Sequence, residues 1–446
     1  GTHTILVRDA AATNTGGYTV AADLVAPTCV DTVPIKLGDT ALTASVSSND
    51  EAHCYTFPAK VNDRMRVRVV ATDGTVEPYT TILNPSGGTV CGPTTQIEQT
   101  CRIVSTGVHT IMVRDHVGTN TGGFSVYLQR LDIPKRCTVI AFGATALTGS
   151  ITVPGDADCY TFRAQTGSRV RVRVVATGGA LVPSTEMINS VGTTLCGPST
   201  AVEQTCRLFT GRRNNTILVR DAAGPNLGDY SIYVQLSHPV SCTPIRLGVA
   251  PLAGAITVPG NADCYTFKGV GGDRMRVRVV GLDGTLVPFT EVINPNGTTN
   301  CGPSSAVEQT CRLTATGTHV ILIRDTAGPG TGSYVVYLQR LDVPAKCSVV
   351  TVGAAAVAGT IALPGEADCY TFDGVGGRRM RVEVIGTDGT LVASTEVINP
   401  NGTTLVGPST AIDQDMRLNA TGTHMIFIRD LAGTGTGGYT VAVTEI

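Results

Sequence analysis

Ala157-Asp158-Cys159-Tyr160-Thr161-Phe162 is a short stretch that recurs along the chain and decides its organisation. It returns at residues 262–267 and 367–372, and a variant, His53-Cys54-Tyr55-Thr56-Phe57, comes before it. The cysteine of each copy lies 105 residues after the cysteine of the preceding copy. A period of this length exceeds that of ordinary solenoid repeats and matches the size of an independent domain. The sequence therefore predicts four similar domains in a row.

Each repeat shows the pattern of short strands joined by tight turns. Residues 64–70 alternate charged and apolar side chains, which is the period of a half-buried strand, and the corresponding residues of the other repeats do the same. Asp-Gly and Asn-Pro-x-Gly turn sequences follow, as at 283–284 and 294–297. No stretch sustains the 3.6-residue apolar period of a helix. We therefore predict an all-β chain, a tandem array of four antiparallel β-sandwiches of jelly-roll or immunoglobulin-like type with seven or eight strands each.

The first residues do not belong to a complete repeat. Residues 1–9 match 107–115, and 16–20 match 122–126, so the chain opens with the closing hairpin of a repeat whose body is absent. Short proline-containing junctions join the repeats and predict a stiff rod. The predicted domains are an orphan closing hairpin over 1–26 and sandwiches over 27–134, 135–239, 240–344 and 345–446.

Composition limits the compartment and the partners. A net charge of −2 provides no field that would attract nucleic acid or an anionic membrane. No apolar run reaches the ~18–20 residues that cross a bilayer. Fourteen cysteines at repeated positions indicate an oxidising compartment, so we expect an extracellular or cell-surface protein and a Gly1 created by trimming of an exported precursor.

A comparison of the repeats predicts how the cysteines pair. Each of the first three repeats holds four cysteines, whereas the fourth keeps two and has Val406 and Met416 at the other positions. Two cysteines that are lost together are most simply disulfide partners. The spacing of the cysteines within the repeats is a poor match to zinc-binding motifs. The predicted disulfides are Cys29–Cys54, Cys91–Cys101, Cys137–Cys159, Cys196–Cys206, Cys242–Cys264, Cys301–Cys311 and Cys347–Cys369.

Three sets of recurrent polar residues are candidate sites. His3, His109, His319 and His424 share one strand position and are interpreted as packed histidines, because each repeat has only one and cannot complete a metal site alone. Asp158, Asp263 and Asp368 follow a glycine turn and are interpreted as turn-stabilising residues, with calcium binding as the alternative.

The arginine rows are the third set. Arg64, Arg66 and Arg68 and their counterparts recur with acidic residues nearby, namely Glu98, Glu203, Glu308 and Asp413. We interpret them as cross-strand ion pairs on the solvent face of each sandwich. Polyanion binding is the alternative.

The order of the turn and strand motifs resembles the bacterial pre-peptidase C-terminal domain. The residues that carry the resemblance are 259–267, 294–298, 316–325 and 332–336, and it extends over every repeat. The resemblance implies a β-sandwich of exported bacterial proteins that often accompanies a secreted protease and is usually not catalytic. The cysteine pairs depart from the common cysteine-poor version of that family, and no protease domain is present.

The sequence favours a structural function. No nucleophile elbow, repeated Ser-His-Asp cluster or phosphate-binding loop occurs, so we predict no catalytic residues and no cofactor. A lone hairpin is marginal in water, which predicts that residues 1–26 donate a strand or hairpin to a second copy and build a head-to-tail filament or surface fibre. The alternatives are that 1–26 is a cut piece of a longer array, or that the chain is an adhesive or matrix- or glycan-binding array of a secreted hydrolase. The predicted subunit-contact residues are Thr4, Ile5, Leu6, Val7, Tyr18 and Val20.

Overall fold

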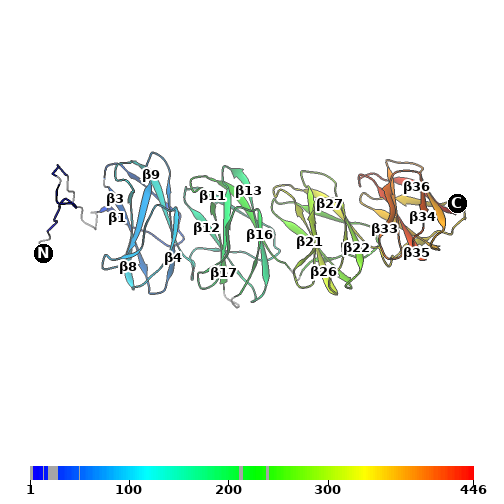
Figure 1. Ribbon diagram of the computed structural model, residues 1–446, viewed down its shortest axis with the longest axis horizontal. Helices are drawn as coiled ribbons and strands as arrows, with labels where there is room; N and C mark the ends of the chain where they lie inside the picture. The colour runs from blue at the N-terminus through cyan, green and yellow to red at the C-terminus, as the bar shows by residue number, and fades with distance from the viewer. Residues whose placement is uncertain (1–3, 14, 19–28, 50, 210–213, 238–240) are drawn as a thin grey trace.

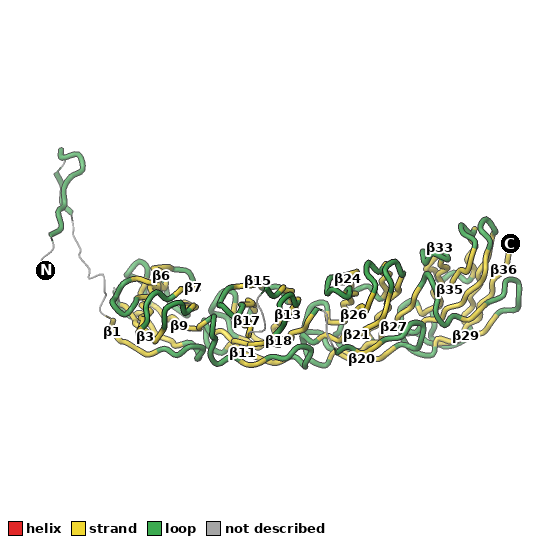
Figure 2. The backbone as a smooth tube through the Cα atoms, turned by 90° about the horizontal axis from the view of Figure 1, so that it is seen from below, coloured by secondary structure: helices red, strands yellow, loops and turns green. Residues whose placement is uncertain are grey.

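The computed structural model places four similar β-sandwiches in a row, with the chain termini at opposite ends (Figure 1). It describes residues 4–13, 15–18, 29–49, 51–209, 214–237 and 241–446. Seen from below, the row curves gently and the first residues lie apart from it (Figure 2). The described residues contain no helix, and therefore none that is long and apolar enough to cross a membrane.

Each sandwich contains nine described strands in a five-stranded and a four-stranded sheet. In sandwich 1 the sheet orders are β1-β3-β8-β5-β6 and β2-β9-β4-β7, and the other sandwiches repeat them. The strands of sandwich 1 are β1 (Cys29–Pro34), β2 (Leu42–Val46), β3 (Ala52–Ala59), β4 (Arg64–Ala71), β5 (Pro78–Leu83), β6 (Thr89–Thr94), β7 (Glu98–Arg102), β8 (Gly107–Asp115) and β9 (Gly122–Arg130).

The other three sandwiches have the same strands in the same order. Sandwich 2 has β10 (Thr138–Val139), β11 (Leu147–Ile151), β12 (Ala157–Arg163), β13 (Arg169–Gly179), β14 (Pro183–Ile188), β15 (Thr194–Ser199), β16 (Glu203–Arg207), β17 (Asn214–Asp221) and β18 (Gly228–Leu236). Sandwich 3 has β19 (Thr243–Pro244), β20 (Leu252–Ile256), β21 (Ala262–Gly269), β22 (Arg274–Gly281), β23 (Pro288–Ile293), β24 (Thr299–Ser304), β25 (Glu308–Arg312), β26 (Gly317–Asp325) and β27 (Gly332–Arg340). Sandwich 4 has β28 (Ser348–Val349), β29 (Val357–Ile361), β30 (Ala367–Gly374), β31 (Arg379–Gly386), β32 (Ala393–Ile398), β33 (Thr404–Ser409), β34 (Asp413–Arg417), β35 (Gly422–Asp430) and β36 (Gly437–Glu445).

The structure confirms the predicted tandem sandwiches and corrects two details. Each has nine strands rather than seven or eight, and the first strand pairs in parallel with the third, as β1 does with β3. Alternate residues of β4, such as Val67 and Val69, point into the core between the two sheets, which explains the alternation seen in the sequence. Each such buried side chain contributes about 1.5–3 kcal/mol.

Seven disulfides join the cysteines in the pattern that the comparison of repeats predicts. One set, such as Cys29–Cys54, ties the first strand to the third. The other set, such as Cys91–Cys101, ties the two sheets together at one edge. In sandwich 4, Met416 is buried and Val406 packs against the core, so apolar contact replaces the missing bond. Disulfides at this density are typical of an oxidising environment.

The predicted hairpin strands at the start of the chain do not appear. Residues 4–13 and 15–18 contain no strand, and Ile5, Leu6 and Tyr18 are 62%, 81% and 69% exposed. Val20 and the rest of 19–26 lie outside the described residues. An isolated pair of strands has no sheet to bury its apolar face against, which accounts for the missing pairing. Docking of this segment on another copy stays a prediction.

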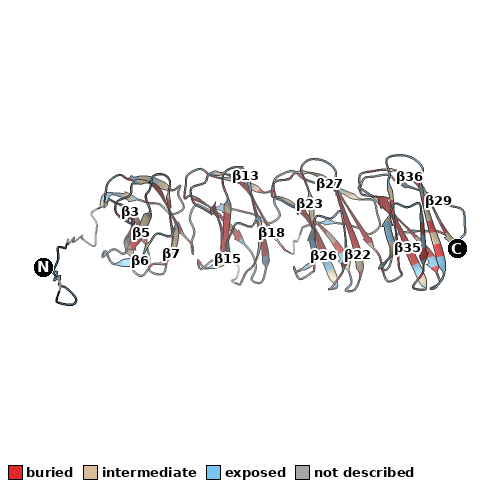
Figure 3. Ribbon diagram, turned by 45° about the horizontal axis from the view of Figure 1, so that its top comes forward, coloured by how far each residue is buried: buried red, intermediate tan, exposed pale blue. Residues whose placement is uncertain are grey.

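The sandwiches stack sheet on sheet. We call the outer surface of each four-stranded sheet the forward face and that of each five-stranded sheet the rear face. The forward face of one sandwich packs against the rear face of the next, so sheets inside the row are covered on both sides. β4 is therefore buried over Met65 to Val70, whereas its counterpart β31 in sandwich 4 alternates between buried and partly exposed positions from Met380 to Val384. Figure 3 shows exposed residues at the C-terminal end of the row.

Candidate functional site at the sandwich junctions

A cluster of five charged side chains fills the junction between sandwiches 1 and 2. Arg66 on β4 donates hydrogen bonds of 2.7 and 3.1 Å to the two carboxylate oxygens of Glu186 on β14. Arg220 on β17 reaches back to Glu98 on β7, with Nε 2.7 Å from the carboxylate, and also contacts Glu186 at 3.0 Å. Arg68 donates to the backbone carbonyl of Asp221 at 2.5 Å. The cluster thus joins β4 and β7 of one sandwich to β14 and β17 of the next.

The carboxylate of Glu186 is held ionised within this interface. It is 1% exposed and accepts a further hydrogen bond of 2.5 Å from the Thr194 hydroxyl. Burial raises the pKa of the Glu186 carboxyl, but hydrogen bonds and charge from Arg66 outweigh burial and lower it to about 2. Attraction within the cluster is offset by the cost of desolvating its charges, whereas removal of one partner would leave an uncompensated buried charge.

The same cluster occurs at the other two junctions. The arginine–glutamate pairs Arg171–Glu291 and Arg276–Glu396 repeat the 2.7 Å contact of Arg66 with Glu186. In each case a second arginine of the forward face donates to a backbone carbonyl, and an arginine of the rear face contacts a glutamate of the forward face. The full sets are Arg171, Arg173, Glu203, Glu291 and Arg324 at the second junction, and Arg276, Arg278, Glu308, Glu396 and Arg429 at the third.

Apolar contacts accompany the ion pairs. Val70 projects from β4 against two glycines of the next sandwich, and a Cβ at Gly155 or Gly224 would lie 3.1 or 2.9 Å from its methyl groups. Both glycines have positive φ, so backbone conformation and close approach require glycine there. Leu131 of sandwich 1 also packs with Ile188 and Leu218 of sandwich 2. Val175 and Val280 meet glycine pairs in the same way at the second and third junctions.

These contacts correct the interpretation of the arginine rows. The cross-strand pairs exist, since Arg66 and Arg68 both contact Glu98. They lie on a covered face, however, with Arg66 and Arg68 only 7% and 4% exposed. The prediction of a solvent face was wrong for sandwiches 1 to 3, because the next sandwich, and not water, lies over this sheet. It holds for sandwich 4, where Arg381 and Asp413 pair with 39% and 44% of their side-chain surfaces exposed.

The recurrent histidines are packed as predicted in the part of the chain that the structure describes. His109, His319 and His424 are fully buried and stack on Phe57, Phe267 and Phe372, with ring centroids 5.3–5.6 Å apart. Each ring nitrogen Nδ1 contacts the carbonyl of the glycine two residues before it. His3 lies outside the described residues.

The recurrent aspartates serve a different purpose from the predicted one. The carboxylates of Asp158, Asp263 and Asp368 accept hydrogen bonds of 2.5–2.6 Å from the hydroxyls of Tyr230, Tyr334 and Tyr439 inside each sandwich, rather than stabilising the turn. Burial raises the pKa of all three carboxyls. Among the described residues no group of three or more His, Cys, Asp or Glu side chains could hold a metal ion.

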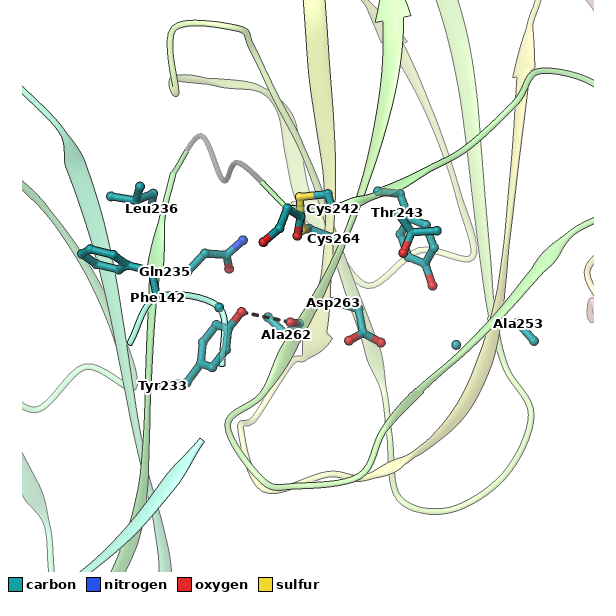
Figure 4. A pocket seen from close by; sticks show the side chains of 14 residues that line it. Phe142, Tyr233, Gln235, Leu236, Cys242, Thr243, Ala253, Ala262, Asp263 and Cys264 are labelled. Carbon is teal, nitrogen blue, oxygen red and sulfur yellow. Dashed lines mark hydrogen bonds between the residues drawn. A yellow bond between two sulfur atoms is a disulfide. The ribbon is translucent and has the colours of Figure 1, made fainter. Parts of the chain in front are cut away.

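A cavity of about 360 Å³ opens at the second junction. Phe142, Tyr233 and Gln235 line it from sandwich 2, and Asp263 and Tyr265 line it from sandwich 3. Figure 4 shows the Tyr233 hydroxyl donating to the Ala262 carbonyl across the junction, at 3.1 Å, beside the Asp263 carboxylate. The cavity can accept a small polar molecule, but the described residues that line it include no nucleophile paired with a base.

The sequence interpretation missed Glu186, Glu291 and Glu396, although a signal for them was present. Their counterpart in the first repeat is Thr81, and the third arginine of each row, the counterpart of Arg68, becomes Glu383 in the fourth repeat. A position that changes its residue type only in the first or the last repeat indicates a residue that pairs with the neighbouring repeat.

No family model and no curated protein matches this chain. Among solved structures it is similar to a periplasmic inhibitor of g-type lysozyme from Aeromonas hydrophila, with 19% identity, 22% of this chain and 98% of that chain covered, and a TM-score of 0.19. It is also similar to the CUB1-EGF-CUB2 domain of human MASP-1/3, with 10% identity, 43% and 99% covered, and a TM-score of 0.15. A third is SGBP-B of the Bacteroides ovatus mixed-linkage glucan utilization locus, with 12% identity, 95% and 100% covered, and a TM-score of 0.14. Scores this low carry no argument about function.

Proposed function

We propose that this chain is a structural, non-catalytic extracellular protein, a stiff rod that serves as a unit of a filament or surface fibre. The observation that carries the proposal is the stacking of four sandwiches through the same buried charged cluster at all three junctions. Sandwiches joined only by linkers would move independently. Sandwiches joined by sheet stacking and paired buried charges hold one orientation and transmit force along the row.

The bacterial pre-peptidase C-terminal resemblance is part of this proposal, because it implies an exported sandwich without catalytic residues. The seven disulfides support an oxidising location, and we place the rod outside the cell or at its surface. We expect no cofactor.

Head-to-tail contact between copies, with residues 1–26 as the contact segment, belongs to the same proposal. Its support is the exposure of the apolar residues Ile5, Leu6 and Val7 and of Tyr18, all of which lie outside the sandwiches. Each described sandwich already contains its own two closing strands, as sandwich 4 does with β35 and β36, so a donated hairpin has no vacant place in a core. The segment would therefore bind a surface or the edge of a sheet on the neighbouring rod.

Electron microscopy of the purified full chain tests the proposal. We expect stiff, gently curved rods of four units that join into fibres whose axial repeat is close to the length of one rod. Isolated rods at every concentration would contradict the filament, and flexible strings of beads would contradict the rod. Substitution of Leu6 and Tyr18 by Ser should reduce fibre formation without changing the rods themselves.

The cavity at the second junction favours one alternative, an adhesive array that binds a glycan. Its polar Asp263, Gln235 and Tyr233 and its aromatic Phe142 are the kinds of side chain that hold a sugar. Isothermal titration with short neutral oligosaccharides tests this alternative. Binding that Asp263→Asn weakens would support it, and absence of heat at millimolar sugar would exclude it.

A further inference from the structure

The forward face of sandwich 4 differs from the forward faces of sandwiches 1 to 3 at the positions that make the junctions. Sandwiches 1 to 3 present two arginines each, such as Arg276 and Arg278, whereas sandwich 4 presents Arg381 and Glu383. In the sheet of sandwich 4, Glu383 lies opposite Asp413. At the equivalent positions of sandwich 3, Arg278 lies opposite Glu308. An attractive cross-strand pair is thus replaced by two like charges.

The replaced arginine makes a contact that a glutamate cannot make. Arg278 donates a hydrogen bond of 2.7 Å to the backbone carbonyl of Asp430, and Arg68 donates one of 2.5 Å to that of Asp221. A carboxylate at this position has no proton to donate and would face a carbonyl oxygen. The corresponding residue on the rear face of sandwich 1 is Asp115. A second copy stacked on sandwich 4 would therefore bring Glu383 against an acceptor.

The remaining arginine of sandwich 4 is already occupied by its own sheet. Arg381 donates hydrogen bonds of 2.6 and 2.9 Å to Asp415 and lies 3.5 Å from Asp413. The counterpart of Asp415 in sandwich 1 is Thr100, which accepts only the Nε hydrogen of Arg66 and leaves the terminal nitrogens for the next sandwich. The side chain of Asp415 is 50% exposed, so this pair lies in solvent.

The rear face of sandwich 1 has changed in a matching way. Thr81 stands where Glu186, Glu291 and Glu396 accept the incoming arginine. In the sequence, Asp50 stands where Gly155, Gly260 and Gly365 receive a valine of the preceding sandwich, although Asp50 itself lies outside the described residues. Of the three charged contacts that define a junction, a second copy could re-form only the one between Asp413 and Arg114.

We propose that the two end faces select against the internal interface, so that one rod does not stack on a second copy of itself through its sheets. Polar substitutions on the outer face of a terminal repeat are how repeat arrays stop adding units. In a fibre, neighbouring rods then make contact through other surfaces, with the exposed residues 4–7 and Tyr18 as the available segment. This inference rests on the junction geometry and not on the proposed function.

Transplanting the end-face residue into an internal junction of the full chain tests the inference. Arg278→Glu should separate sandwich 4 from sandwich 3, raising hydrogen exchange in β32 and β35 about tenfold or more and increasing the flexibility seen in small-angle scattering. Unchanged protection of β23 against hydrogen exchange would show that sandwich 3 stays folded in this variant. The matched control, Glu383→Arg, should leave exchange in sandwich 4 unchanged.

Two results would overturn the inference. The first is an Arg278→Glu chain whose junction stays as protected as in the wild type, because a glutamate there would then be compatible with stacking. The second is end-to-end assembly of the wild-type chain that Asp413→Arg abolishes, because this variant reverses the one charge match left between the end faces. Fibre formation that is insensitive to Asp413→Arg supports the inference, and absence of fibres bears on the proposed function alone.

Discussion

Arg66 of sandwich 1 and Glu186 of sandwich 2 form a two-pronged ion pair across a junction where only 9% and 2% of their side-chain surfaces stay exposed. They are 120 residues apart in sequence, one repeat plus the offset between the two sheets. Repetition of this pair at the other junctions turns a string of domains into a stack of sheets. The orientation of each sandwich relative to the next is therefore set by charge pairing as well as by shape.

Removing the carboxylate from this pair should loosen the first junction. Glu186→Gln leaves Arg66 and Arg220 buried with one anionic partner fewer, which we expect to cost about 3–5 kcal/mol of junction stability. Hydrogen exchange of β14 and β17 measures the change. The control is Asp415→Asn, which breaks an ion pair in solvent and should have a much smaller effect, because water screens exposed charges. Equal effects of the two variants would show that burial of the first pair does not matter.

A side chain at a junction glycine should force the sandwiches apart. In Gly433→Ala the new Cβ would lie 2.7 Å from a methyl group of Val280, at a φ of +98° that alanine tolerates poorly. We expect a loss of about 2–4 kcal/mol in junction stability. Val280→Ala should recover part of it. Gly353→Ala, with a φ of +79° and open space around the Cβ, measures the backbone cost alone.

Asp156 should make the stability of sandwich 2 depend on pH. Burial raises the pKa of its carboxyl to about 6, above the ordinary value of 3.8, although a backbone hydrogen bond from Ala157 opposes the shift. A raised folded-state pKa favours the protonated form of Asp156. Its contribution to the stability of sandwich 2 is therefore fully present below about pH 4 and is lost as the pH rises through 6. Asp156→Asn should remove this dependence and gain about 1 kcal/mol at pH 7, after allowance for solvent screening.

Thermal unfolding of the wild type and of Asp156→Asn at pH 4 and pH 7 measures this effect. Sandwich 3 supplies a natural precedent, because Asn261 stands at the same position and accepts a hydrogen bond of 2.7 Å from the Ala146 amide. A variant that loses stability at pH 7 would contradict the assignment.

The partly buried Asp368 and the buried Tyr439 of sandwich 4 should be energetically coupled. Tyr439→Phe leaves the Asp368 carboxylate without its 2.5 Å hydrogen bond and should cost about 1–3 kcal/mol. Sandwich 1 has His53 and Phe124 at these positions, with His53 3.2 Å from Glu51, and Glu366 is the counterpart of Glu51. Adding Asp368→His to Tyr439→Phe should therefore restore stability. A double-mutant cycle by chemical denaturation tests the coupling, and additive losses would refute it.

The edge disulfides should be replaceable by the residues of sandwich 4. In Cys301→Val with Cys311→Met, apolar packing takes the place of a bond that closes a short loop, as Val406 and Met416 do. We expect sandwich 3 to fold with a stability loss of about 2–3 kcal/mol. Cys301→Ser with Cys311→Ser should cost more, because it places one hydroxyl at the buried position 311 and another at the partly buried position 301. Calorimetry under non-reducing conditions compares the two.

The sequence by itself determined the repeat, the strand pattern, the all-β class and the cysteine pairing. These depend on local spacing or on a comparison of positions within one repeat, and both can be read from a single chain. The packed histidines followed from the same reasoning, because a lone histidine on an apolar strand has nothing with which to complete a site.

Only the tertiary structure decided what lies over each sheet. An alternating strand with arginines on one face is compatible with water or with another sheet, and the choice depends on how successive sandwiches are oriented. The structure was therefore needed to show that Arg66, Glu98 and Glu186 form one cluster across the junction between two sandwiches. The same reason explains the first residues of the chain: a hairpin sequence forms strands only where a sheet exists to pair with it, and the described residues 4–13 and 15–18 pair with no sheet.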